Sequence, residues 1–95
     1  EQFDARFAKT PLERPGYEGL RRNAAIVLGN RGDQAAVTAL IKAIDDDSAV
    51  VRGTIAWSLG QLGGEPAVAA LKARLEVETE PGVLVELQQA IARST

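Results

Sequence analysis

The chain has 95 residues and a net charge of −2, and it contains neither Cys nor His. One domain of this length can bury a hydrophobic core, but without Cys or His it lacks the commonest transition-metal ligands, a thiolate nucleophile and the commonest general base. We therefore expect no catalytic residues, no metal site and no cofactor in this chain.

The charge is unevenly distributed along the chain. Residues 1–31 carry a net charge of +2 and the rest carries −4, so the N-terminal part could face a polyanion; so small an imbalance also suits an ordinary solvated surface. No apolar run approaches the roughly 20 residues that a membrane-spanning helix needs, and no signal peptide is recognisable. We expect a soluble, cytoplasmic domain that does not contact a membrane.

Residues 1–16 are predicted to form an N-terminal cap and linker. Phe3 and Phe7 are four residues apart, so a short helix would present both rings on one face. Pro11, Pro15 and Gly16 then require an extended connection. Because the end units of repeat stacks have an uncovered outer face, we expect this segment to cover the first repeat.

Residues 17–47 are predicted to form the first helical hairpin. The buried face of its first helix is predicted from residues at helical spacing: Leu20, Ala24, Val27 and Leu28. Gly29 is expected to end that helix in a left-handed conformation, and Asp33 is the expected N-cap of the second helix. The second helix is predicted to bury these residues: Ala36, Val37, Leu40, Ile41 and Ile44.

The same design returns 31 positions later, in residues 48–79, where Leu59 corresponds to Leu28 and Gly60 to Gly29. A partial third repeat over residues 80–95 follows at an offset of 32, so that Val83 corresponds to Val51. A period in the thirties with apolar residues at helical spacing is the signature of stacked helical hairpins. The sequence therefore predicts an all-α fold, an α-α superhelix of hairpin repeats.

An acidic turn, Asp45–Asp47, separates the two full repeats. A calcium loop needs ligands at alternating positions and a final bidentate Glu, and this turn has neither. We predict that Asp47 or Ser48 caps the next helix instead.

The segment Asp47–Gly60, DSAVVRGTIAWSLG, resembles the HEAT-like repeat first described in phycobilisome lyases. The shared features are an acidic residue, a Val-Arg pair, small residues and then Leu-Gly. A narrower resemblance covers residues 7–63. Within it, FAKTPLERPG, GLRRNAAIVLGNRGD and VRGTIAWSLG are similar to the C-terminal HEAT-like region of epoxyqueuosine reductases, iron-sulfur and cobalamin enzymes of tRNA queuosine modification.

That resemblance implies a non-catalytic helical domain of such an oxidoreductase, whose iron-sulfur clusters and cobalamin belong to a preceding region. The implied partners are tRNA, held by its anticodon arm, and the catalytic domain of the same protein, but not DNA. The candidate RNA-binding residues are Arg14, Arg21, Arg22, Asn23, Asn30, Arg31 and Trp57. Arg offers a planar fork to phosphate, Asn offers a donor and an acceptor to nucleotide edges, and Trp offers a ring for base stacking.

Several of these residues also have structural interpretations. Arg21 corresponds to Arg52 at the offset of 31, a position where Arg could tie one repeat to the next. Asn23 could bond a loop carbonyl near Pro15, and Asn30 could be a turn residue. Trp57 corresponds to Ile26 and could simply fill the stack.

Two other functions are compatible with the repeats. The chain could be a protein interaction scaffold that docks a partner or its own catalytic domain on the concave surface. A bilin lyase-type function is a further alternative, and it rests on the type of repeat alone.

Overall fold

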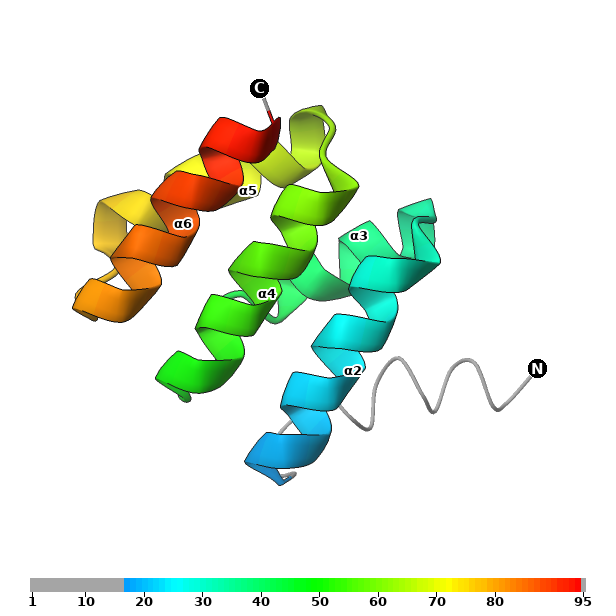
Figure 1. Ribbon diagram of the computed structural model, residues 1–95, viewed down its shortest axis with the longest axis horizontal. Helices are drawn as coiled ribbons and strands as arrows, with labels where there is room; N and C mark the ends of the chain where they lie inside the picture. The colour runs from blue at the N-terminus through cyan, green and yellow to red at the C-terminus, as the bar shows by residue number, and fades with distance from the viewer. Residues whose placement is uncertain (1–16, 95) are drawn as a thin grey trace.

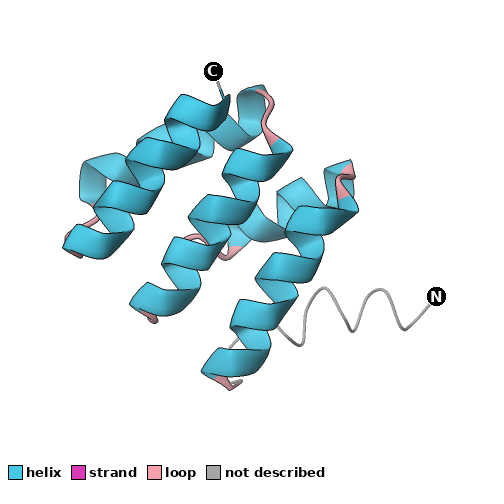
Figure 2. Cartoon of the chain, in the orientation of Figure 1, coloured by secondary structure: helices cyan, strands magenta, loops and turns pink. Residues whose placement is uncertain are grey.

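The computed structural model describes residues 17–94, and all regular secondary structure in this range is helical (Figure 2). The elements are α2 (Glu18–Arg31), α3 (Gln34–Lys42), α4 (Ala49–Leu62), α5 (Glu65–Val77) and α6 (Pro81–Ser94). The all-α prediction is thus confirmed. The predicted N-terminal helix, the Pro-rich connection and Arg14 lie outside the described residues.

The five helices form two layers (Figure 1). The first helix of each hairpin lies in one layer, so that α4 is flanked by α2 on one side and α6 on the other. Helices α3 and α5 pack behind this layer. No helix within residues 17–94 is long and apolar enough to cross a membrane.

The helix boundaries follow local capping chemistry. A carboxylate oxygen of Asp33 accepts a hydrogen bond from the Ala36 amide at 2.8 Å, and the Ser48 hydroxyl accepts one from the Val51 amide at 3.2 Å. Both residues satisfy amides that a helix start leaves unpaired, as predicted for Asp33 and Ser48. At its C-terminus α2 ends at Gly32, whose φ of 75° few other residues adopt.

The role predicted for Gly29 is wrong, because Gly29 lies inside α2. A Cβ atom at this position would lie 2.7 Å from the hydroxyl oxygen of Ser58 on α4. Its counterpart Gly60 lies equally close to α6, where a Cβ would be 2.8 Å from the Cβ of Ala90. These glycines therefore let neighbouring helices approach closely and do not end a helix.

Buried core residues recur along the chain at the predicted offsets of 31 and 32 positions. Fully buried aliphatic side chains come from all five helices: Leu28, Leu40, Val51, Ile55, Leu59, Leu71 and Leu87. Leu28 and Leu59 have equivalent positions in α2 and α4, and Val51 and Val83 have equivalent positions in α4 and α6. Ile41 and Ile44, predicted to be buried, are half-buried at the edge of this core.

The predicted buried face of α2 is partly wrong. Leu20 is 56% exposed and Val27 is 45% exposed, whereas Arg21 and Ala25 are buried. The residues of α4 that correspond to Leu20 and Val27 are Val51 and Ser58, and both are buried. The reason is that α2 covers this side of α4, where the Ser58 hydroxyl donates to the Ala25 carbonyl, while no described helix covers the equivalent side of α2.

Candidate nucleic-acid interface

Two neighbouring arginines of α2 differ in burial: Arg21 is buried and Arg22 is exposed. Arg21 is only 5% exposed, and its guanidinium forms a two-point contact with Asp46: Nε to Oδ2 at 2.9 Å and Nη2 to Oδ1 at 3.1 Å. The hydrogen bonds to Asp46 raise the pKa of Arg21. Buried and engaged in this way, Arg21 cannot be the phosphate contact that the sequence suggested.

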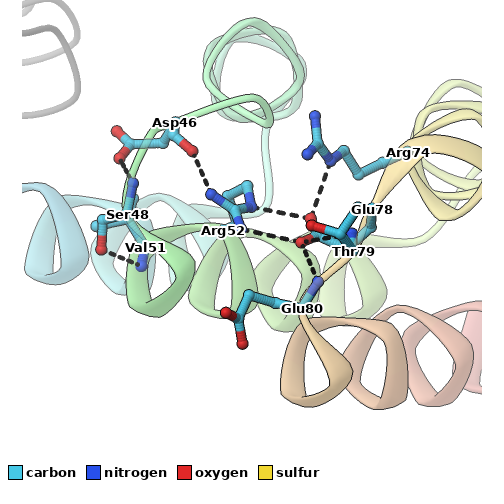
Figure 3. A network of polar contacts seen from close by, with 8 residues as sticks. All are labelled: Asp46, Ser48, Val51, Arg52, Arg74, Glu78, Thr79 and Glu80. Carbon is cyan, nitrogen blue, oxygen red and sulfur yellow. Dashed lines mark hydrogen bonds and ion pairs between the residues drawn. The ribbon is translucent and has the colours of Figure 1, made fainter.

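Arg52 repeats this arrangement one unit further on (Figure 3). Its Nε and Nη2 atoms donate to Oε1 and Oε2 of Glu78, both at 2.9 Å. Its Nη1 atom donates to the backbone carbonyl of Asp46 at 2.8 Å, so Arg52 ties the second repeat to the end of the first. Arg74 adds a third contact to Glu78, from Nε to Oε1 at 3.0 Å.

The acidic partners also fasten the loops that lead into α4 and α6. Asp46 accepts a hydrogen bond from the Ser48 amide at 2.9 Å, and Glu78 accepts one from the Glu80 amide at 3.1 Å. Sequence reasoning missed both carboxylates. The available signal was that Asp46 and Glu78 are 32 positions apart, which is the offset between the second and third repeats.

Arg22, the next residue of α2, differs from Arg21 in its surroundings. It is exposed, and no described residue forms an ion pair or a hydrogen bond with its guanidinium. Because a helix has about 3.6 residues per turn, Arg22, Ile26 and Asn30 form one row along α2, with Asn23 beside it. We call these four residues the α2 strip: Arg22, Asn23, Ile26 and Asn30.

The side-chain amides of Asn23 and Asn30 are exposed and, within residues 17–94, bond no other group. The bond from Asn23 to a loop near Pro15 involves a residue outside the described range. Arg31, by contrast, donates from Nη2 to the carboxylate of Asp33 at 2.8 Å, at the turn between α2 and α3. The structure thus brings together three candidates on one strip, and it places Arg31 at the end of the helix beside an acid.

Trp57 of α4 and two residues of the α2 strip line the same groove. Trp57 is half-buried, and it lines a cavity of about 540 Å³ together with Arg22 and Ile26 of α2 and parts of α6. The indole ring therefore does not fill the space between the layers. Its equivalence to Ile26 holds, since both residues line the same groove, to which no described residue of α3 or α5 contributes.

Positions on the two sides of this layer differ in how they repeat. The inward position held by Arg21 in α2 is again Arg in α4, and Leu28 is again Leu. Outward positions change: Arg22 becomes Gly53, and Ile26 becomes Trp57. The inward pairs pack in the same way in α2 and α4, whereas the outward pairs have no such constraint and differ.

This chain lacks the ligands of an iron-sulfur cluster. Iron-sulfur clusters need thiolate ligands, and the sequence has no Cys. Residues 17–94 contain no group of three acidic side chains arranged to hold a metal ion. Asp46, the middle residue of the acidic turn, is committed to Arg21.

The repeat geometry agrees with the comparison with known families, in which the family model that describes HEAT repeats matches residues 12–92. The chain belongs to the HEAT repeat family. This HEAT repeat chain is also 38% identical over 73 residues to an epoxyqueuosine reductase of Listeria monocytogenes, an alignment that covers 76% of the chain and 19% of the reductase.

Two further relatives of the HEAT repeat chain differ in name. An uncharacterised protein of Geobacillus stearothermophilus is 32% identical over 91 residues, which cover 95% of the chain and 42% of that protein. The phycocyanobilin lyase subunit alpha of a Picosynechococcus species is 47% identical over 60 residues, which cover 63% of the chain and 22% of the lyase. The chain therefore spans less than half the length of each of these three relatives.

Proposed function

We propose that this chain is a non-catalytic helical-repeat part of an epoxyqueuosine reductase-like protein, and that its α2 strip helps to hold the anticodon arm of tRNA. A cytoplasmic location belongs to the same proposal, as do iron-sulfur clusters and cobalamin in the remainder of such a protein. The similarity to the Listeria reductase supports the first part. The chemistry of α2 supports the second.

The observation that carries the tRNA contact is the exposed guanidinium of Arg22, which has no partner among residues 17–94. A free, exposed guanidinium can form two parallel hydrogen bonds to a phosphate, whereas Arg21 and Arg52 are occupied by carboxylates. Asn23 and Asn30 add amide donors and acceptors that can contact ribose and base edges. The strip therefore combines phosphate contact with nucleotide contact on one rigid helix.

Binding of an anticodon stem-loop RNA to the full-length protein tests this proposal. We expect Arg22→Ala, and separately the double change Asn23→Ala with Asn30→Ala, to weaken binding several-fold. Lys72→Ala is the matched control, because Lys72 is an exposed cation on α5 in the opposite layer. If the strip variants bind the RNA as tightly as the wild type and the Lys72 variant do, the tRNA contact lies elsewhere.

A further inference from the structure

The groove beside Trp57 is a second candidate surface. It crosses the outer side of the layer formed by α2, α4 and α6, and its apolar lining comes from all three helices, with Ile26, Val50, Trp57 and Val83. Its volume of about 540 Å³ is within the range of about 300–1,000 Å³ typical of ligand sites. No function assigned above uses this groove as a whole.

Two glycines line the groove although the fold does not require them. Neither Gly53 nor Gly82 has a positive φ, and a Cβ atom at either position would meet no heavy atom within 4 Å. Glycine in the middle of a helix is less stable than alanine, so Gly53 weakens α4. What Gly53 provides is space, since a side chain at this position would project into the groove.

The charges in the groove are divided between its two sides. Among the described residues, Arg22 is its only basic lining residue and belongs to α2, while Glu80 and Glu86 lie on the α6 side. The Glu80 side chain points away from the ion pairs of Glu78 (Figure 3). Glu86 has a loose contact with Arg93, at 3.9 Å. Two carboxylates repel phosphate and attract a cation, so the α6 side does not suit a nucleic-acid backbone.

We propose that this groove binds a short peptide segment of a partner protein, in which a large apolar side chain is followed closely by Lys or Arg. The apolar side chain packs on Trp57 above Gly53, where the missing Cβ leaves room. The cationic side chain faces Glu80 and Glu86, with which it forms charge-assisted hydrogen bonds. The proposal does not depend on tRNA binding, although the two surfaces meet at Arg22.

Trp57 is the only Trp in the chain, so its fluorescence reports directly on the groove. The probes are unlabelled peptides of about twelve residues. Each has one central Leu followed by two Arg in a Gly-Ser background. A matched set carries Glu in place of Arg. We expect the Arg peptides to shift Trp57 emission in a saturable way in the full chain, and the Glu peptides to have no effect at about 1 mM.

Two variants test separately the acidic side of the groove and the space above Gly53. The double change Glu80→Gln with Glu86→Gln is expected to weaken binding of the Arg peptides by about tenfold. Gly53→Leu is expected to abolish binding while the helical circular dichroism signal is retained, because a Cβ atom at this position would meet no heavy atom within 4 Å. Glu76→Gln, an exposed carboxylate on α5, is the control and should bind as the wild type does.

Three results would overturn the peptide proposal. They are the absence of any emission shift with Arg peptides at about 1 mM, equal binding by the double Gln variant, and stronger shifts with a single-stranded RNA oligonucleotide than with the peptides. The last result would make the groove part of an RNA surface. Failure of the tRNA proposal is distinguishable through the double change Asn23→Ala with Asn30→Ala, because these two residues do not line the groove, whereas Arg22 belongs to both surfaces.

Discussion

Replacing Glu78 by Gln tests the ion-pair design that ties the repeats together. Burial raises the pKa of Glu78, but hydrogen bonds from Arg52, from the Glu80 amide and from Arg74 outweigh it and lower the pKa from 4.5 to about 2. A pKa lowered from 4.5 to about 2 corresponds to about 3 kcal/mol of stability at neutral pH. Because the folded-state pKa is the lower one, this contribution is present above about pH 4.5 and is lost as the pH falls toward 2.

The assay is urea unfolding followed by far-ultraviolet circular dichroism at two pH values. We expect Glu78→Gln to lower the free energy of unfolding by about 3 kcal/mol near pH 7 and by roughly half as much near pH 3, where about half of the contribution of the carboxylate has gone. Domains are usually stable by about 5–15 kcal/mol, so the variant should still fold. Glu76→Gln, on the exposed side of α5, is the control and should change stability little.

The reasoning is wrong if Glu78→Gln costs less than about 0.5 kcal/mol near pH 7, which is what an exposed ion pair would give. It is also wrong if the loss is the same at both pH values. A constant loss would mean that the shape of the side chain matters and its charge does not.

Three substitutions in α4 give further predictions. Gly53→Ala should raise the unfolding free energy by about 0.5–1 kcal/mol, because the new methyl group meets nothing and alanine favours the helix. Gly60→Ala should lower it by about 1–3 kcal/mol, because its Cβ would lie 2.8 Å from that of Ala90; effects of the same sign in urea titrations would contradict the close-packing argument. Leu59→Ala should cost about 2–5 kcal/mol in the same titration, and a loss below about 1 kcal/mol would mean that the buried site collapses around the smaller side chain.

The pairing of helices was predictable because the period of the sequence carries it directly. Residues that pack in the same way in each hairpin recur at the same offset, so Leu28 and Leu59 identify two helices without any knowledge of their contacts. Capping residues are equally local, and for this reason Asp33 and Ser48 were predicted.

The exact face of α2 was not predictable from the same pattern. Leu20 is apolar like its buried counterpart Val51, and Val27 has the spacing of a buried face, but burial depends on which helix lies alongside, and that is set by the tertiary structure. Gly29 shows the same difficulty, since a glycine at the end of an apolar run suits both a helix stop and a close helix contact. The distance to Ser58 decides between the two.

The candidate site was predicted only in part. The repeat offset suggested a structural role for Arg21, which aligns with Arg52, and none for Arg22. The contact with Asp46 supports that structural role, and it could not be read from the sequence. The groove beside Trp57 could not be predicted, because it is made by outward residues of three helices that are far apart in the sequence.

The most direct test of the tRNA contact is the salt dependence of binding to an anticodon stem-loop by the full-length protein. A phosphate contact releases counterions, so the logarithm of the affinity falls with the logarithm of the salt concentration by about 0.7–0.9 for each contact. We predict that Arg22→Ala lowers this slope by about that amount, while Lys72→Ala leaves it unchanged. Equal slopes for the wild type and the Arg22 variant would contradict the account.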